Sequence, residues 1–388
     1  MYITRNIEGR LLKLLEYFPA VAILGPRQAG KTTLVKEIRK QLNKESIYLD
    51  LENPVDLGAL EHPVEFLNSV KNKTVIIDEI QRKPDLFPIL RTLIDANRIN
   101  SRFILLGSAS PQLLFLSNET LAGRIVYLEL TPFEFTEIQH ITDFRNHWLR
   151  GGFPDPFMLP DQLIRKEWFK SFISAYVERD LRILGLNTAS GNLQRLLQMI
   201  SASQSGILNI SSLANSLGVS APTISNSISF FEHSFIVRLL QPWHSNIGKR
   251  LVKSPKIYIR DSGITNYLLN ISEYEDILRH PLLGNLWEGY VIENIINTLG
   301  DAYTYYFYRT ADGTECDLLI FKGNDCLAAI DSKFASRPKS TRSMTITIQD
   351  LNPQKAFYVV PECTIPYKIN DNQFIATPWQ LIEIIQTM

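Results

Sequence analysis

Residues 25–32 read Gly25-Pro-Arg-Gln-Ala-Gly-Lys-Thr32, and this stretch decides the fold of the N-terminal part. Its two glycines let the backbone curl until its N–H groups face a phosphate, and a helix that begins near Lys31 adds its positive dipole end. Lys31 can reach the β- and γ-phosphates of a nucleotide, and Thr32 can ligate Mg²⁺. We therefore predict a phosphate-binding loop. Its expected members are Gly25, Pro26, Arg27, Gln28, Ala29, Gly30, Lys31, Thr32 and Thr33.

The sequence on either side of the loop gives the structural context that this motif requires. Residues 18–24 form a short apolar run, typical of a buried parallel strand, and residues 32–40 have helical character. Further runs rich in apolar and β-branched residues, 73–79 and 102–108, predict two more strands of the same kind. The succession of strand, loop and helix predicts an α/β domain that binds a nucleotide.

Polar side chains at the ends of these strands are candidate catalytic residues. Asp78 can complete the shell of a Mg²⁺ ion, and Glu79 can orient or deprotonate the attacking water. The alternative for this pair is two solvated acids at a strand end. Ser108 ends the third run, where its hydroxyl could bond the γ-phosphate or the water, although serine is also common there for turn reasons alone.

These motifs resemble the AAA+ ATPase superfamily, in its prokaryotic branch that joins the ATPase to a C-terminal domain of unknown function. Further segments carry the resemblance along the chain: 121–124, 130–135, 151–154 and 176–180. The resemblance implies ATP as the nucleotide and arginines that touch its γ-phosphate, for which Arg124 and Arg179 are the candidates. Both arginines could equally form surface salt bridges. AAA+ proteins often assemble as rings, so a homo-oligomer is implied, although no residue shows one.

The middle of the chain predicts a helix-turn-helix. Residues 161–205 have a helical pattern, and residues 211–228 then read as two short helices joined at Gly218, with Ser220 as the cap of the second helix. Downstream, residues 238–260 form a basic stretch that suggests the wing and strand of a winged helix in contact with DNA. Between Arg238 and Arg260 at its ends, it contains Lys249, Arg250, Lys253 and Lys256. Winged helices also serve as protein-packing modules, so the DNA contact stays open.

The C-terminal third brings acids and a lysine into one pattern. Asp317 lies in one predicted strand, and Asp331 and Lys333 lie in the next, so adjacent antiparallel strands could bring them together. Two carboxylates can hold Mg²⁺ while a lysine positions a water. The arrangement resembles the PD-(D/E)XK nuclease superfamily, which implies metal ligands at Asp317 and Asp331, a catalytic Lys333 and a helical acid at Glu288.

Two features leave this nuclease interpretation open. Asp331 stands where many members of the superfamily have glutamate, and many proteins of this fold have lost activity. Such a domain can simply bind DNA or a protein partner, and Asp331 and Lys333 can simply balance each other on a solvated hairpin. Gln349 is an accessory candidate in the following segment.

Length and composition bound the remaining choices. The 388 residues suit two or three domains, because domains have about 100–200 residues. The net charge is zero, so only local patches can indicate nucleic acid. The three cysteines form no metal-binding pattern and suit a reducing cytoplasm. The charged N-terminus does not resemble a signal peptide, and no run of about 18 apolar residues predicts a membrane span.

We accordingly expect an α/β protein in four parts: an AAA+ ATPase domain (1–160), a helical lid or linker (161–205), a winged helix-turn-helix (206–270) and a nuclease-like domain with the α/β restriction-endonuclease fold (271–388). The first hypothesis for its function is a Mg²⁺-dependent ATPase that acts on DNA. The rival hypothesis is an ATP-driven switch that binds a protein partner and has an inert nuclease-like site.

Overall fold

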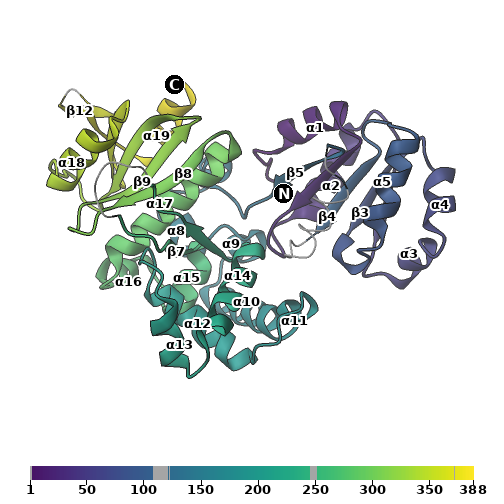
Figure 1. The fold of residues 1–388 in the computed structure, drawn as a ribbon, viewed down its shortest axis with the longest axis horizontal. Helices are drawn as coiled ribbons and strands as arrows, with labels where there is room; N and C mark the ends of the chain where they lie inside the picture. Colours follow the sequence, from purple (N-terminus) through teal and green to yellow (C-terminus); the bar gives the residue numbers. More distant parts are fainter. Residues whose placement is uncertain (1, 108–120, 122, 245–250, 371) are drawn as a thin grey trace.

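The computed structural model describes residues 2–107, 121, 123–244, 251–370 and 372–388. Ser108, Lys249 and Arg250 lie outside these residues, so their predicted roles stay predictions. Figure 1 shows the N-terminal α/β unit on one side of the molecule, and the middle and C-terminal parts together on the other side. Within the described residues, no helix is long and apolar enough to cross a membrane.

The N-terminal unit is a five-stranded parallel sheet in the order β2-β3-β4-β1-β5. Its strands are β1 Ala20–Leu24, β2 Ser46–Asp50, β3 Thr74–Asp78, β4 Phe103–Gly107 and β5 Ile125–Glu129. Every residue of β1, β3 and β4 is buried, as expected for apolar runs covered on both faces. The three strands predicted from the sequence are therefore confirmed.

Helices cover both faces of this sheet. On one face α1 (Glu8–Tyr17) and α2 (Lys31–Ile38) share a core with alternate residues of β1 and β4. On the other face α5 (Leu86–Ala96) packs, with α3 (Pro54–Ala59) and α4 (Pro63–Ser69) beyond it. Because all five strands are parallel, their carboxyl ends meet at one edge, and the loop after β1 opens there.

Three short helices lead out of the N-terminal sheet: α7 Phe135–Ile138, α8 Phe144–Arg150 and α9 Pro154–Met158. Their apolar side chains belong to the core of the C-terminal part. Phe144 and Trp148, for example, both pack against Trp287 of that part. The predicted boundary at residue 160 stays a prediction, but the segment just before it is already shared with the rest of the molecule.

The middle part is helical, with one antiparallel strand pair. Its elements are α10 Gln162–Ala175, a π-helical turn Tyr176–Asp180, α11 Leu181–Ile183, α12 Ser190–Ala202, α13 Ile210–Leu217, α14 Ala221–His233, β6 Val237–Leu240, β7 Lys256–Ile259, α15 Ser262–Leu268 and α16 Tyr274–Arg279. The predicted helix pair is confirmed as α13 and α14, because Gly218 takes a φ of 65° between them and the Ser220 hydroxyl caps the second helix. Its assignment as a winged helix stays a prediction.

The C-terminal part is a mixed six-stranded sheet in the order β12-β13-β11-β10-β9-β8. Its elements are α17 Leu283–Leu299, β8 Thr304–Arg309, β9 Glu315–Lys322, β10 Asp325–Ser332, α18 Arg342–Leu351, β11 Lys355–Val359, β12 Tyr367–Asn370, β13 Gln373–Ala376 and α19 Pro378–Gln386. Strands β8, β9 and β10 are antiparallel, whereas β10 pairs with β11 in parallel. The predicted hairpin of β9 and β10 is confirmed. Whether this domain belongs to the nuclease-like class stays a prediction.

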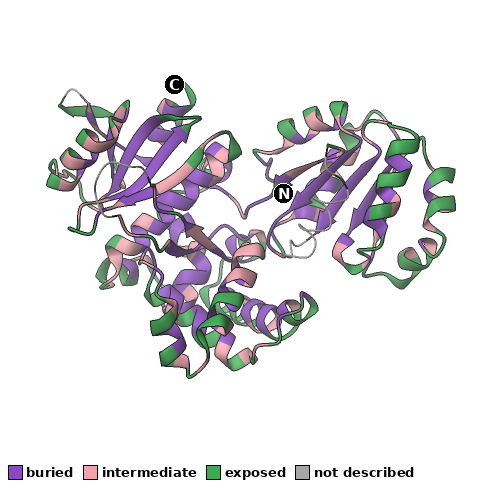
Figure 2. Ribbon diagram, in the orientation of Figure 1, coloured by how far each residue is buried: buried purple, intermediate pink, exposed green. Residues whose placement is uncertain are grey.

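Helix α17 is buried on most sides. Most of its residues from Leu286 to Leu299 are buried, because the helix packs on the C-terminal sheet and also against α15 and α16 of the middle part. Figure 2 shows most strands of the two sheets as buried, and the outer helices as largely exposed. Helix α17 therefore lies where a change in one part of the molecule can reach another.

Candidate functional site

The phosphate-binding loop joins β1 to α2 and has a backbone that only certain residues allow. Gly30 has a φ of 96°, in the left-handed region that favours glycine. A Cβ at Gly25 would come within 2.1 Å of the carbonyl oxygen of Leu130, so only glycine fits there. The two glycines of the motif are thus required for different reasons. Gly30 allows the turn at one end of the loop, and Gly25 allows close packing on the chain after β5 at the other end.

Lys31 lies inside this loop with its ammonium group against the loop backbone. Its Nζ donates to the carbonyl oxygens of Gly25 at 2.9 Å and Pro26 at 2.8 Å. Burial lowers the pKa of Lys31 to about 8, against the opposing effect of the nearby Glu79 and Asp78 carboxylates. Lys31 is thus a desolvated cation held by two neutral acceptors, and phosphate oxygens can take their place.

Thr32 and Asp78 form the second element of the site. The Thr32 hydroxyl donates to Asp78 Oδ2 at 2.7 Å, and the Tyr48 hydroxyl of β2 donates to the same oxygen at 2.5 Å. A hydroxyl and a carboxylate oxygen meeting beside a phosphate-binding loop are the oxygen donors that Mg²⁺ prefers. The residues present therefore fit a Mg²⁺ ion held through Thr32 and Asp78.

Glu79 follows Asp78 in a backbone conformation that is uncommon for glutamate. Its φ is 56°, and its N–H donates to Asp78 Oδ1 at 2.9 Å. Burial raises the pKa of Glu79, while Lys31 opposes that shift, and Gln81 bonds the carboxylate. A partly desolvated carboxylate with a raised pKa is suited to accept a proton from water near neutral pH.

A cleft of about 500 Å³ opens beside the loop. Its wall includes Gly30 and Thr33 of the loop, and rings from distant segments complete it. These rings are Tyr2, Phe133 and Trp168. The surface is largely apolar and aromatic, which suits a flat ring system attached to a phosphate chain.

Arg5 is a residue of the site that the sequence analysis missed. It is buried and donates to the loop carbonyl of Ala29 at 3.1 Å and to that of Thr131 at 2.6 Å. Its Nε also pairs with Glu137 at 3.0 Å. The only sequence signal is indirect: Glu134 and Glu137 are two acids three positions apart in an apolar segment, and buried acids need a cation.

The arginine candidates differ in where they lie. Arg179 bonds Asp180 at 3.0 Å, and Asp180 also pairs with Arg27 of the phosphate-binding loop at 2.6 Å. Arg124 instead bonds Asp95 of α5 at 2.6 Å. Arg179 therefore contacts Asp180, which itself pairs with the phosphate-binding loop. Arg124 instead contacts a surface helix. Their roles at a γ-phosphate stay predictions.

The acids of the C-terminal part do come together, but around a lysine from another part of the chain. Lys256 of β7 has 1% of its side chain exposed. Its Nζ lies 2.8 Å from Glu288 of α17, and 2.6 Å and 3.4 Å from Glu315 and Asp317 of β9. Lys256 belongs to the basic stretch whose contact with DNA was left open, and its share in such a contact is corrected here, because β7 directs the side chain into the protein.

The other two predicted members lie on the edge of this cluster. Asp331 pairs with Lys333 at 2.6 Å, and the N–H of Ser332 donates to Asp317 at 2.8 Å. Burial raises the pKa of Glu288 and that of Asp331 to about 7, and the neighbouring Asp317 carboxylate adds to both shifts. The predicted meeting of Asp317, Asp331 and Lys333 is confirmed.

The predicted metal ligation by these acids finds no support in the arrangement. Over the described ranges, no group of three or more His, Cys, Asp or Glu side chains is arranged to hold a metal ion. The ligand roles of Glu288, Asp317 and Asp331 and the catalytic role of Lys333 stay predictions. Gln349 is exposed on α18.

The rest of the basic stretch is also largely committed. Arg238 and Arg260 both pair with Glu293 of α17, at 2.5 Å and 3.2 Å, and Arg260 pairs further with Glu129 at the end of β5. Lys253 is exposed. The two arginines at the ends of the basic stretch therefore join the three parts of the molecule.

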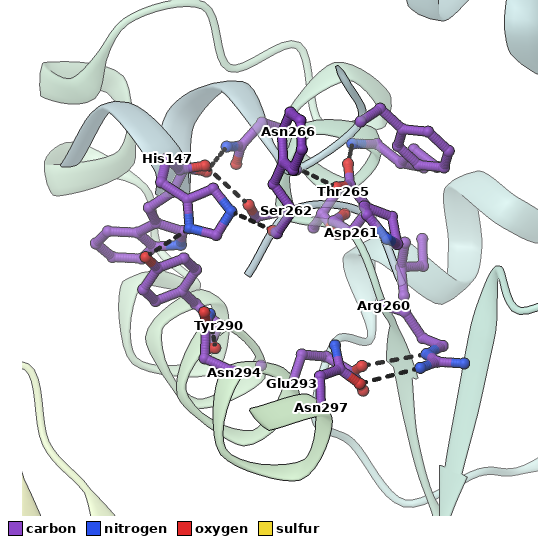
Figure 3. Close-up of a pocket in the computed structure, with 18 of the residues that line it drawn as sticks. His147, Arg260, Asp261, Ser262, Thr265, Asn266, Tyr290, Glu293, Asn294 and Asn297 are labelled. Carbon is purple, nitrogen blue, oxygen red and sulfur yellow. Dashed lines mark hydrogen bonds and ion pairs between the residues drawn. The ribbon is translucent and has the colours of Figure 1, made fainter. Parts of the chain in front are cut away.

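Figure 3 shows the junction where these parts meet, a cavity of about 40 Å³ that is lined by both polar and apolar side chains. His147 of α8 bonds the Tyr290 hydroxyl of α17 at 3.0 Å, and Asp261 accepts from the Gly152 N–H at 2.8 Å. Burial lowers the pKa of His147 to about 4, so this ring is neutral at physiological pH. Because these polar groups bond one another, the junction holds the parts of the molecule together.

Comparison with known proteins agrees with this division. Three family models match successive segments: an AAA domain over residues 17–139, a domain of unknown function (DUF8612) over 141–275, and a second one (DUF4143) over 283–382. Uncharacterized protein Rv2008c of Mycobacterium tuberculosis is 37% identical over 358 residues, which cover 92% of this chain and 80% of that protein. Uncharacterized protein MJ1544 of Methanocaldococcus jannaschii is 25% identical, over 83% of this chain and 76% of that protein.

Among solved structures, the Walker-type ATPase PABY2304 of Pyrococcus abyssi is similar with a TM-score of 0.47 and 15% identity, over 69% of this chain and 96% of that chain. The stronger finding is the mycobacterial relative, which matches most of both chains. This chain therefore belongs to the family of Rv2008c, as an AAA-type P-loop ATPase with a C-terminal DUF4143 domain.

Proposed function

We propose that this protein is a Mg²⁺-dependent ATPase that works as a switch, in which the nucleotide state of the phosphate-binding loop controls how the middle and C-terminal parts hold a macromolecular partner. One observation carries the proposal: the loop is bonded, through charged side chains, to both of these parts. The chemistry lies in the loop, and two lines of contact lead away from it.

The first line runs from the loop to α17. Arg5 holds the loop carbonyl of Ala29 and pairs with Glu137. Glu137 in turn accepts from the N–H of Glu134 at 3.0 Å, and the Glu134 carboxylate accepts from the Thr298 hydroxyl of α17 at 3.0 Å. Because each of these groups is bonded on both sides, a shift of the loop backbone changes the bonds at α17.

The second line runs from the loop to the middle part. Arg27 pairs with Asp180 of the π-helical turn at 2.6 Å, and more weakly with Glu52 at 3.5 Å. π-Helical turns interrupt regular helices and are frequent at functional sites. A γ-phosphate at the loop competes with Asp180 for the Arg27 guanidinium. This competition weakens the contact that holds the π-helical turn against the loop.

The proposed chemistry uses residues of this chain at each step. Lys31 exchanges its two backbone acceptors for phosphate oxygens, and Glu79 accepts the proton of the attacking water. Thr32 and Asp78 hold Mg²⁺, which neutralises charge on the phosphates when it is bound. The aromatic cleft beside Gly30 receives the base, so that the nucleotide spans the loop and the rings of Tyr2 and Trp168.

A DNA partner is the second candidate, and one observation favours it. The α13–α14 pair exposes small polar side chains at the start of its second helix, namely Ser220, Ser225 and Asn226. Such residues can contact phosphates or base edges. The buried Lys256 and the paired Arg238 and Arg260 weaken the electrostatic case, so a protein partner is favoured.

Steady-state ATP turnover with Mg²⁺ tests the proposal, measured alone and with single-stranded, duplex and branched DNA. Lys31→Ala should abolish turnover, whereas Lys36→Ala, an exposed lysine of the same helix, should leave it intact. Turnover equal in the wild type and Lys31→Ala would overturn the ATPase. Stimulation by one form of DNA would make DNA the partner, and indifference to every form would favour a protein.

A further inference from the structure

The cluster around Lys256 has the composition of a cation site, but the cation is part of the chain. Three carboxylates from two elements of the C-terminal part converge on one buried ammonium: Glu288, Glu315 and Asp317. An ammonium group has three N–H donors, and each has a carboxylate within ion-pair distance here. Lys256 itself comes from β7, in the middle part.

Each carboxylate is also fixed by a second contact. Glu288 accepts from the Tyr258 hydroxyl at 2.7 Å, Glu315 pairs with Arg309 at 3.0 Å, and Asp317 accepts from the Ser332 N–H at 2.8 Å. A carboxylate with such a second partner cannot turn freely toward another ion. The carboxylates of this cluster therefore already have their partners, with Lys256 at the centre, and they need no further ligand.

The charges around the cluster lead to the same view. Among the described residues, the positive groups besides Lys256 are Lys333, bonded to Asp331, and Arg309, bonded to Glu315. These three cations face four carboxylates, so the cluster is close to neutral without an added ion. A divalent ion bound by these carboxylates would lie at contact distance from the buried ammonium of Lys256. The repulsion between the two cations in a desolvated site is costly.

We propose that Lys256 is the resident cation of this cluster, and that the C-terminal domain therefore works without a divalent metal ion. The ammonium takes the position that a nuclease would give to Mg²⁺. It ties β7 of the middle part to α17 and β9 of the C-terminal part. The acids of the domain then hold the middle and C-terminal parts together without a metal ion, and they do not form a cleavage site.

This inference concerns a different site from the ATPase and does not depend on ATP hydrolysis. It also accounts for the direction of nearby contacts, since Arg238 and Arg260 reach from the same strand pair and its flank to Glu293 of α17. Lys256 is thus one of three cations that fasten the middle part to this helix and its sheet.

Thermal unfolding of the full chain without nucleotide, in EDTA and across a Mn²⁺ titration, tests the proposal. The wild type should show no saturable Mn²⁺ stabilisation that depends on Asp317. Lys256→Ala should melt lower in EDTA and gain a saturable rise of several degrees with Mn²⁺, because the vacated acids can now bind the ion. Adding Asp317→Asn to that variant should remove the rise. Lys253→Ala, an exposed lysine three positions earlier, should behave as the wild type.

Two results would overturn the proposal. The first is Mn²⁺ binding, or Mn²⁺-dependent nicking of DNA, by the wild type that is lost in Asp317→Asn but kept in Asp78→Asn. The second is a folded Lys256→Ala that gains no response to Mn²⁺. If Lys256→Ala does not fold, Lys256→Met takes its place, because methionine keeps most of the buried stem. If that variant does not fold either, the Mn²⁺ response of the wild type compared with that of Asp317→Asn decides the question.

Discussion

Two buried lysines lie beside carboxylates in this protein, and they differ in what their ammonium groups touch. Lys31 bonds two neutral backbone carbonyls, and burial lowers its pKa to about 8. Lys256 is bonded by three carboxylates, and these raise its pKa well above the ordinary value in spite of its burial. The same side chain is therefore poised for an incoming anion at one site and already satisfied at the other.

The difference shows how an acidic cluster should be judged. At the phosphate-binding loop, Asp78 accepts from two hydroxyls and the ammonium of Lys31 bonds two backbone carbonyls, so charge remains for a phosphate and a metal ion. At the C-terminal cluster every acid has a cation or a backbone donor. Composition alone makes both look like Mg²⁺ sites, and only the partner of each charge separates them.

The largest effect should follow from breaking the satisfied site. Lys256→Ala leaves the buried Asp317 and the partly buried Glu288 and Glu315 without their shared cation, and should lower the free energy of unfolding by about 3–5 kcal/mol at neutral pH. Urea denaturation in EDTA measures this loss. The exposed Lys253→Ala serves as the control. A loss below about 1 kcal/mol would mean that the acids are solvated and that Lys256 is no internal counterion.

The next effect concerns the poised site. Glu79→Gln keeps the shape of the side chain but cannot accept a proton, so ATP turnover should fall about 100-fold or more while ATP still binds. Turnover and equilibrium binding of ATP check the two parts separately, with the exposed Glu61→Gln as the control. A variant that turns over ATP at the wild-type rate would remove Glu79 from the mechanism.

The pH dependence of kcat/KM should be bell-shaped. Glu79 must be deprotonated, and burial raises its pKa, so the rate rises with pH through that raised value. Lys31 must be protonated to hold phosphate, and its pKa is lowered to about 8, so the rate falls above that pH. Glu79→Gln should flatten the acidic limb of its residual rate. A wild-type profile that still climbs above pH 8 would contradict the assigned state of Lys31.

The smallest effect should come from the contact between the loop and the middle part. Asp180→Asn removes the charge opposite Arg27, but the pair is partly exposed, so stability should change by less than about 1 kcal/mol. The coupling between ATP and the middle part should weaken by about 1–3 kcal/mol. The affinity for ATP, measured with and without the partner, reports this coupling. Glu178→Gln, in the same turn, should leave it unchanged.

Sequence reasoning succeeded where the needed residues are contiguous or repeat with a regular period. The loop from Gly25 to Thr32 is one segment, and the strands that end at Asp78 and Gly107 are apolar runs of ordinary length. Their parallel packing follows from burial on both faces. Asp317 and Asp331 were likewise placed together, because a hairpin joins their strands.

It failed where a charged side chain from a distant segment completes a site. Arg5 lies far from Ala29 and Glu137 in sequence, and nothing local marks it as buried. Lys256 shares a basic stretch with exposed residues, so its inward direction depends on β7 packing against the C-terminal sheet. Asp180 pairs with Arg27 across two parts of the chain. Tertiary packing decides such pairs, and period and propensity do not carry that information.

Hydrogen exchange of Glu79→Gln, with and without saturating Mg·ATP, tests the switch most directly, because this variant should hold ATP without turning it over. The account predicts altered protection in the loop 25–32 together with the π-helical turn Tyr176–Asp180 and helix α17 (Leu283–Leu299). Arg5→Lys should shrink the response of α17, since lysine cannot make all the bonds of the buried guanidinium. Changes confined to the loop and its own sheet, with the turn and α17 unaffected, would contradict the switch.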